Sequence, residues 1–271
     1  MLGLAHLESF VLNGFRVCSP RSVASSSLFD MRAALAASVG FAPRTAHRGV
    51  TRRAVTRAVT MDASRTDETV AERLKKTSTE IILGSGSSTR RAILSGMGID
   101  YVIEKPDIDE KAIRFDDPKE LVEALARAKA KAVVEKLTGK GRGARRLLVT
   151  CDQVVVHRGV IREKPSSAAE AREFIRGYGI DPPSTVGSTM ITDLESGQTA
   201  MAVDVNTVVF DAIPDDVVDA IVEEGECMYC AGGLMVEHPL VQPYLKRIEG
   251  TMEGIMGLDS ATVSRLLDEF V

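Results

Sequence analysis

The chain has 271 residues, of which 44% are hydrophobic and 27% charged, a composition typical of a folded globular protein. Its apolar runs all fall short of the roughly 18 residues that a membrane-spanning helix needs, so we expect no membrane partner. Residues 1–60 carry eight arginines and two acids, whereas residues 61–271 carry 26 basic and 36 acidic side chains. An acidic body disfavours nucleic-acid binding, although a few placed lysines and arginines suffice for a small nucleotide.

Residues 1–60 have the composition of a targeting segment. They are rich in Ser, Ala and Arg and nearly free of acids, which is typical of a plastid or mitochondrial transit peptide. A disordered tail, or a true start at Met61, are the alternatives. We therefore expect a targeting or disordered segment over 1–60 and one folded domain over 61–271. The location would be plastid or mitochondrion with a transit peptide, and cytoplasmic without one.

Apolar periodicity and capping residues predict the elements of the body in chain order. The first half should hold a short helix before residue 80, strands over 80–84 and 101–105, helices over 88–97 and 118–137, and a strand pair over 147–161. The second half should hold helices over 166–177, 214–224 and 261–270, and strands over 184–193, 199–210, 232–237 and 244–251. Early alternation followed by hairpins predicts an α/β domain with a mixed sheet, not a purely parallel one.

Residues 85–91, Ser-Gly-Ser-Ser-Thr-Arg-Arg, follow a predicted strand and open a predicted helix. Small residues let the backbone approach an anion, and a helix N-terminus offers free N–H groups. The hydroxyls and arginines add further donors for phosphate oxygens. The segment is no Walker A loop, because it has no Gly-Lys-Ser/Thr. The alternative is a Ser-capped helix with two solvated arginines.

Acidic residues at two places are candidate metal ligands or bases. Asp107, Asp109 and Glu110 put three acids in four residues, and carboxylate oxygens suit a hard cation; a polar loop is the alternative. Asp152 and Gln153 stand within an apolar strand, where an acid is costly unless it is paired or bound to metal. We favour Asp152 as a metal ligand or general base over a strand-end residue that bonds a loop.

Single lysine, glutamate, histidine and cysteine residues add weaker candidates. Lys164 precedes a proline that keeps its backbone extended, and Lys129 lies on a predicted helix; either could contact phosphate, though each alone is more often a surface residue. Glu237 could accept a hydrogen bond from a base edge, while His238 is more often structural. The pair Cys227 and Cys230 has no second Cys-x-x-Cys, so we favour structural or incidental thiols.

Five segments, in order and spacing, resemble the motifs of the Maf family. They are LGSGSSTRR at 83–91, DIDE at 107–110, AKA at 128–130, CDQVVV at 151–156 and EKP at 163–165. The similarity runs from about Glu80 to the C-terminus. It implies a two-lobed fold of the Maf and inosine-triphosphatase-like group, with a cleft between the lobes. It also implies a homodimeric enzyme that hydrolyses a nucleoside triphosphate to the monophosphate and pyrophosphate.

The resemblance also implies roles for the candidate residues. Ser85 and Arg90 would hold the phosphates, and Lys129 and Lys164 would neutralise charge on the phosphoryl oxygens. Catalysis of this kind is mostly positioning and electrostatics.

The reaction centre would hold two acids. Glu110 and Asp152 would bind a divalent cation, Mg²⁺ or Mn²⁺, or activate the water that attacks the α-phosphorus. Asp152 is the favoured base.

The sequence departs from the family pattern at several positions. Thr89 stands at the first arginine, Ser88 at the usual proline, and Arg90 takes the second arginine, so one phosphate or specificity contact is altered. Gln153 and Glu237 are similar to the branch that acts on 7-methyl-GTP. A carboxylate facing guanine meets two N–H donors, whereas thymine offers one. We expect 7-methyl-GTP as substrate, with dTTP or UTP as the alternative.

Two other classes of function stay open. A nucleotide-binding regulator without catalysis is one, against which the retained acids and lysines of the site speak. A nucleic-acid-binding protein that uses the Arg-rich loop over 141–146 is the other. The acidic body and the aromatic content of 4% disfavour it.

Overall fold

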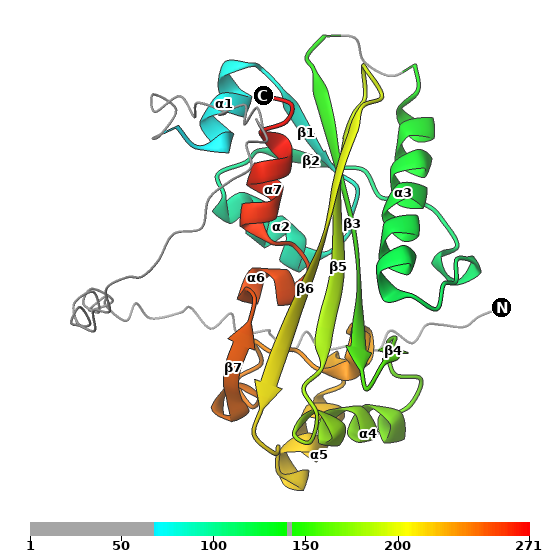
Figure 1. Ribbon diagram of the computed structural model, residues 1–271, viewed down its shortest axis with the longest axis vertical. Coiled ribbons are helices and arrows are strands. Elements are labelled where there is room, and N and C mark those ends of the chain that lie inside the picture. The colour runs from blue at the N-terminus through cyan, green and yellow to red at the C-terminus, as the bar shows by residue number, and fades with distance from the viewer. Residues whose placement is uncertain (1–67, 140–142) are drawn as a thin grey trace, which may run out of the picture. The chain divides into compact units, whose positions relative to one another are not determined.

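A computed structural model describes residues 68–139 and 143–271 (Figure 1). The expected targeting segment over 1–60 lies outside the described residues, as does part of the Arg-rich loop over 141–146. No helix in the part of the chain that the structure describes combines the length and apolar character needed to cross a membrane.

The described chain alternates helices and strands as far as β3 and then runs mostly through hairpins. The α-helices are α1 (Val70–Lys76), α2 (Ser88–Gly96), α3 (Pro118–Leu137), α4 (Ala168–Tyr178), α5 (Asp215–Glu224), α6 (Met252–Ile255) and α7 (Ser260–Leu267). The strands are β1 (Glu80–Leu83), β2 (Tyr101–Ile103), β3 (Arg146–His157), β4 (Val160–Arg162), β5 (Ser184–Asp193), β6 (Thr199–Phe210) and β7 (Leu245–Glu249). Four 3-10 turns are η1 (Glu110–Ala112), η2 (Glu226–Tyr229), η3 (Ala231–Gly233) and η4 (Gln242–Tyr244).

One mixed sheet joins all of these strands. Its order is β2-β1-β3-β5-β6-β7, and β4 also pairs with β3. β1 runs parallel to both of its neighbours, whereas the β3–β5, β5–β6 and β6–β7 pairs are antiparallel. The expected mixed α/β sheet with flanking helices is therefore confirmed.

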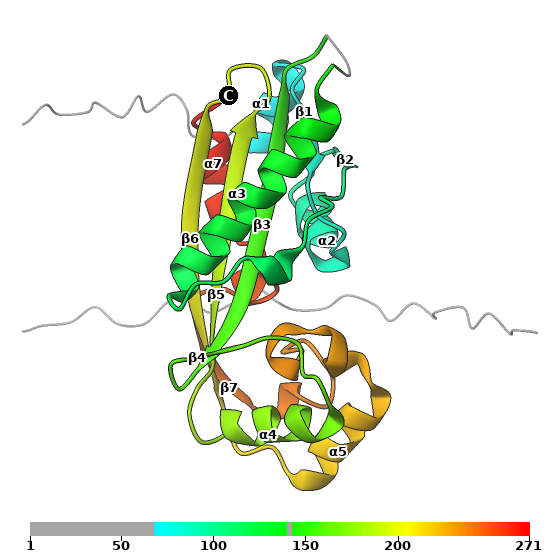
Figure 2. The ribbon, with the colours of Figure 1, turned by 90° about the vertical axis from the view of Figure 1, so that its right-hand side faces the viewer.

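Helices cover both faces of the sheet (Figure 2). α3 packs on one face through two clusters, one with Leu148 and one with Val154, while α1, α2 and α7 pack on the other around Val149 and Cys151. Successive residues of a strand point to opposite faces, which explains this alternation along β3. A separate core joins α4 and α5 to the end of β6, away from α7 (Figure 1). The clusters on the two faces of the sheet form one of the expected lobes, and the core around α4 and α5 forms the other.

Most predicted elements are confirmed, and α3 has the predicted bounds. The Asp117 carboxylate accepts hydrogen bonds from the backbone N–H groups of Lys119 and Glu120, at 2.7 and 3.1 Å, and Pro118 occupies the first turn. The strand predicted over 232–237 is wrong. Gly232 and Gly233 have φ of 72° and 67°, a left-handed backbone that ends any strand, and the segment forms η3 and a turn instead.

Candidate active site

The site lies where one edge of β3 is left open. Parallel pairing with β1 ends as the Gly84 N–H donates to the Val149 carbonyl at 2.8 Å. On the same edge, β4 joins only from Val155 onward. Between these two pairings, the Cys151 carbonyl accepts a hydrogen bond from Arg90 Nη1 at 3.3 Å. A side chain thus donates to β3 where a neighbouring strand would otherwise do so. The open edge places backbone and side chains of β3 beside the segment that follows β1.

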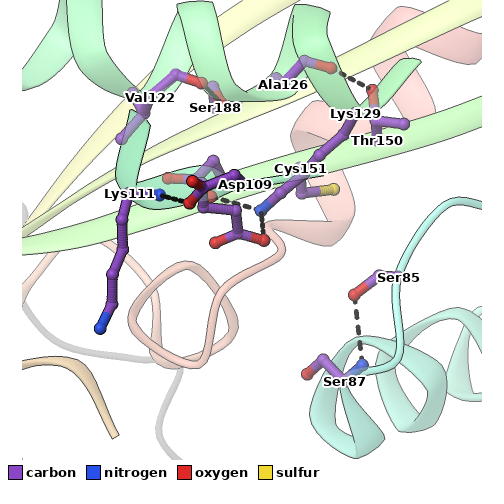
Figure 3. A network of polar contacts seen from close by, with 12 residues as sticks. Ser85, Ser87, Asp109, Lys111, Val122, Ala126, Lys129, Thr150, Cys151 and Ser188 are labelled. Atoms are coloured by element: carbon purple, nitrogen blue, oxygen red, sulfur yellow. Dashed lines mark hydrogen bonds and ion pairs between the residues drawn. The ribbon is translucent and has the colours of Figure 1, made fainter. Parts of the chain in front are cut away.

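The segment after β1 forms a tight turn into α2. A Cβ atom on Gly84 would lie 2.7 Å from Thr150 Cγ2, so only glycine fits against β3 here. Ser85 Oγ accepts from the Ser87 N–H at 3.2 Å (Figure 3). Ser87 Oγ caps α2 by accepting from the Arg90 N–H at 3.3 Å. The N-terminus of α2 therefore faces the open edge, as expected for an anion-binding turn.

The Arg90 side chain makes several hydrogen bonds within the protein that the sequence did not predict. Its Nε donates to the Gly257 carbonyl at 2.9 Å, and its Nη1 lies 3.4 Å from Ser85 Oγ in addition to the Cys151 bond. Arg91 Nε donates to the Ser87 carbonyl at 3.3 Å. Both arginines of this segment are thus partly committed to protein acceptors.

Lys129, Asp152 and Glu110 meet on the α3 face of the sheet. Lys129 Nζ lies 2.5 Å from Asp152 Oδ1 and 3.1 Å from Glu110 Oε1. The side chains of Lys129 and Asp152 are each 8% exposed, whereas that of Glu110 is 54% exposed. Burial makes the Lys129–Asp152 pair costly to break, because either charge alone would lack a partner.

Two hydrogen bonds hold α3 in place above this pair. Thr150 Oγ1 donates to the Ala126 carbonyl at 3.1 Å, and Ser188 Oγ donates to the Val122 carbonyl at 2.7 Å (Figure 3). They fix the helix that carries Lys129 against the strands that carry the acid.

Electrostatics make Asp152 a better proton acceptor than an ordinary aspartate. Burial raises the pKa of the Asp152 carboxyl above its usual value, although Lys129 and Arg90 act in the opposite direction. A raised pKa strengthens a carboxylate as a base. The Cys151 thiol beside it is kept protonated, because burial raises its pKa as well.

Asp152 and Glu110 fit a divalent cation only if the substrate also supplies ligands. Among the described residues, no group of three or more His, Cys, Asp or Glu is placed to hold a metal ion. Mg²⁺ is commonly held by one or two carboxylates, substrate phosphates and water. The Asp152 and Glu110 carboxylates both approach Lys129 Nζ, so they lie close enough to share one cation. The remaining oxygen ligands would come from the substrate phosphates.

A cavity of about 670 Å³ brings the predicted residues together. Seven of the predicted residues line it: Ser85, Arg90, Glu110, Lys129, Gln153, Lys164 and Glu237. Asp152 lies directly behind the lining, bonded to Lys129. Gln153 points to the opposite face of β3, where its Nε2 donates to the Gly254 carbonyl at 2.7 Å. The cavity therefore reaches both faces of the open edge.

The far end of the cavity contains two residues that the sequence reasoning missed, Glu226 and Tyr229. They line it together with Cys230 and Glu237, and Tyr229 is 75% exposed. Burial raises the pKa of the Cys230 thiol, Glu237 adds to that effect, and Lys164 opposes it, so these charged groups surround the thiol. The sequence held no specific signal for them, because the exposure of Tyr229 and its place in one cavity with Glu237 are decided by the tertiary structure.

Two weaker candidates have structural surroundings. His238 Nε2 lies 2.8 Å from Glu224 Oε2, and its Nδ1 accepts from the Leu240 N–H at 3.2 Å, in agreement with the structural interpretation. Cys227 is a buried free thiol in the α4–α5 core.

The fold and the site together define an α/β domain in which a Ser-rich turn at the start of a helix shares a cavity with the lysine of a buried lysine–aspartate pair. The family model described as Maf-like protein matches residues 80–270. The 7-methyl-GTP pyrophosphatase of Dictyostelium discoideum is 36% identical over 195 residues, which are 71% of this chain and 98% of the relative. The chain therefore belongs to the Maf family.

Two bacterial relatives support the same family membership. The nucleoside triphosphate pyrophosphatase of Thermosynechococcus vestitus is 35% identical over 189 residues, covering 69% of this chain and 91% of the relative. A protein of the same name from Salinispora tropica is 33% identical over 190 residues, covering 70% and 83%.

Proposed function

We propose that this protein hydrolyses 7-methyl-GTP to 7-methyl-GMP and pyrophosphate. Membership of the Maf family and the names of its relatives support the coarser statement, that the chain is a nucleoside triphosphate pyrophosphatase, a hydrolase of phosphoanhydride bonds. The observation that carries the base preference is the presence of Glu237 and Gln153 in one cavity with the buried pair. The relative from Dictyostelium discoideum adds support.

In the proposed reaction, Asp152 accepts a proton from the water that attacks the α-phosphorus. The bond between the α-phosphorus and the bridging oxygen breaks, and pyrophosphate leaves. Lys129 holds the Asp152 carboxylate in place at 2.5 Å, and burial makes that carboxylate more basic. Lys164, an exposed residue of the cavity lining, neutralises charge on the phosphate oxygens.

A divalent cation, Mg²⁺ or Mn²⁺, belongs to this proposal. Glu110 and Asp152 would hold it together with the substrate phosphates, and when bound it would neutralise charge that develops on their oxygens. The lining supports the need for one. Three basic side chains, Arg90, Lys129 and Lys164, are balanced by three acids, Glu110, Glu226 and Glu237. A triphosphate therefore meets little net positive charge from the lining alone.

The far end of the cavity suits a cationic purine. A guanine edge presents N–H donors that the Glu237 carboxylate can accept. Methylation at N7 gives the purine ring a positive charge, which attracts Glu226 and Glu237. The charged ring can also stack on an aromatic side chain such as that of Tyr229. A pyrimidine brings neither the ring charge nor a second donor, so this end favours the methylated purine.

The expected homodimer and organelle remain part of the proposal. Light scattering would measure the first. Imaging a fluorescent fusion to the full chain, beside one that lacks residues 1–60, would measure the second.

The decisive experiment is a hydrolysis panel with the full chain and Mg²⁺ or Mn²⁺. The substrates are 7-methyl-GTP, GTP, dTTP, UTP, CTP and ITP, scored for monophosphate and pyrophosphate, with chelator as a control. We expect 7-methyl-GTP to have the highest kcat/KM. A pyrimidine in first place would keep the chemistry and refute the base preference. If the protein bound these nucleotides without metal and hydrolysed none of them, a nucleotide-binding regulator would be the better interpretation.

A further inference from the structure

We propose that Lys105 is an additional phosphate-binding residue, which lies over the turn after β1 and supplies the cation that Thr89 does not. The assignment rests on the proposed function, because it adds a substrate contact to the same site. It concerns a residue outside the five segments that resemble the family motifs.

Parallel pairing brings Lys105 to this turn. β2 and β1 are adjacent parallel strands in register from Ile81↔Tyr101 to Leu83↔Ile103, so their carboxyl ends lie side by side. The Glu104 N–H continues the ladder by donating to the Leu83 carbonyl at 3.1 Å. Segments that follow adjacent parallel strands meet at one edge of a sheet, which is where ligands bind in open α/β sheets.

The Lys105 side chain crosses directly over Gly86. A Cβ atom on Gly86 would lie 3.0 Å from Lys105 Cε and 3.6 Å from its Nζ. The absence of a side chain at Gly86 therefore leaves room for Lys105. The ammonium group lies beside Gly86, which lines the cavity. The backbone of Lys105 is held in place, because Lys136 Nζ donates to its carbonyl at 2.8 Å.

The charge of Lys105 is available to a ligand. Within residues 68–139 and 143–271, no carboxylate forms an ion pair with its ammonium group, and the side chain is exposed. The other cations near the phosphate turn are partly committed: Lys129 to two carboxylates, and Arg90 to the Gly257 and Cys151 carbonyls. A triphosphate on this turn would find uncommitted positive charge at Lys105, in addition to Lys164 of the cavity lining.

Thr89 explains why such a cation is needed here. It occupies the second position of α2, beside the N-terminal N–H groups, and it lines the cavity without carrying charge. A charge-assisted hydrogen bond to phosphate is about twice as strong as a neutral one, so a threonine hydroxyl is a poor substitute for a cation. Lys105 approaches the same turn from the neighbouring strand.

The test uses five variants of the full chain: Lys105→Met, Lys105→Arg, Thr89→Arg, the double variant Lys105→Met/Thr89→Arg, and Lys111→Met. Lys111 is the matched control. Like Lys105 it is an exposed lysine between β2 and α3, but its side chain points away from Lys129 (Figure 3). Steady-state hydrolysis of 7-methyl-GTP gives KM and kcat, and calorimetry gives the Kd of inorganic tripolyphosphate, which needs no hydrolysis.

We expect Lys105→Met to raise KM and the tripolyphosphate Kd by about 10- to 100-fold with kcat changed far less, as for loss of a charged hydrogen bond. Lys105→Arg and the double variant should recover most of this loss, while Lys111→Met should bind as the original does. Equal binding by Lys105→Met and the original would overturn the assignment, whether or not the protein hydrolyses 7-methyl-GTP. An inactive original whose tripolyphosphate binding still depends on Lys105 would refute only the proposed function.

Discussion

The two ends of the cavity are built differently. At the phosphate end, the turn after β1 is fixed by parallel pairing, by the cap of α2 and by the buried Lys129–Asp152 pair. At the base end, η2 carries the exposed residues Glu226 and Tyr229, and the exposed Glu237 lies on the turn after η3, which requires positive φ at Gly232. The proposed base Asp152 and its partner Lys129 are thus held by a strand and a helix, whereas Glu237, which we propose selects the base together with Gln153 of β3, lies on a turn.

The physical reason is that the two tasks tolerate different errors. Positioning a base and a phosphorus requires side chains locked by packing and hydrogen bonds. Choosing among bases requires only a difference in binding energy, which exposed residues on turns can provide. The predictions below test this division, from the largest expected effect to the smallest.

Asp152→Asn should lower kcat by about 10²- to 10⁴-fold, the usual contribution of a general base. The amide keeps the shape of the side chain but cannot accept the proton of water. Stopped assays of pyrophosphate release would measure the loss, and a calorimetric Kd for 7-methyl-GTP would show that binding persists. A variant within tenfold of the original rate would remove Asp152 from its role as base.

Lys129→Met should destabilise the protein by about 3–5 kcal/mol, because the buried Asp152 carboxylate loses its partner. Urea unfolding would measure this change. Adding Asp152→Asn to the same chain removes the unpaired charge, so the double variant should regain stability without regaining activity. Independent, additive losses would show that the two groups do not act as a pair.

Gly232→Ala should cost about 1–3 kcal/mol and weaken substrate binding at the base end. Its φ is 72°, and a Cβ there would lie 2.8 Å from Val155 Cγ2 and 2.9 Å from Tyr178 Oη. Gly197→Ala is the matched control, since its φ is 73° but its Cβ would meet nothing within 4 Å. Equal losses of stability in the two variants would mean that η3 is not tightly packed.

Acid should loosen the region around α7 and β5 through Asp193. Burial alone would raise the pKa of Asp193, but hydrogen bonds from Arg145 and from the Glu195 and Ser196 N–H groups lower it below its usual value. The stabilisation, about 1.5–3 kcal/mol for charged hydrogen bonds, is complete above the unfolded-state pKa of about 3.9. It is lost as the pH falls through the lower folded-state pKa.

Unfolding free energies measured from pH 6 down to pH 2.5 would test this linkage. The original should lose more stability than Asp193→Asn over that interval. Parallel curves would show that Asp193 makes no pH-dependent contribution.

Glu237→Gln should reduce the preference for 7-methyl-GTP over UTP by about tenfold while leaving the fold intact, because Glu237 is exposed. The ratio of the two kcat/KM values is the measurement. Glu223→Gln, an exposed acid of α5 outside the cavity lining, is the control. An unchanged ratio in Glu237→Gln would move the base preference to other residues of the base end.

Local sequence signals predicted most elements, because their causes lie within a few residues. Asp117 and Pro118 begin α3, and Ser87 caps α2. The strand predicted over 232–237 failed where two glycines adopt positive φ, a choice that hydrophobic patterning does not reveal. The site residues implied by the resemblance came from motif order, and the cavity contains or adjoins all of them. Of the three acids at 107–110, only Glu110 lines it, and the Asp109 carboxylate caps η1 instead.

The sequence by itself determined the class of fold, the family and the list of polar residues at the site, because periodicity, caps and motifs are local properties. Only the tertiary structure decided how those residues combine. The Lys129–Asp152 bond joins residues 23 positions apart, and its strength depends on burial by α3 and the sheet. The approach of Lys105 to Gly86 depends on the pairing of β1 with β2. Desolvation and strand pairing are long-range effects, so no local pattern in the chain could predict them.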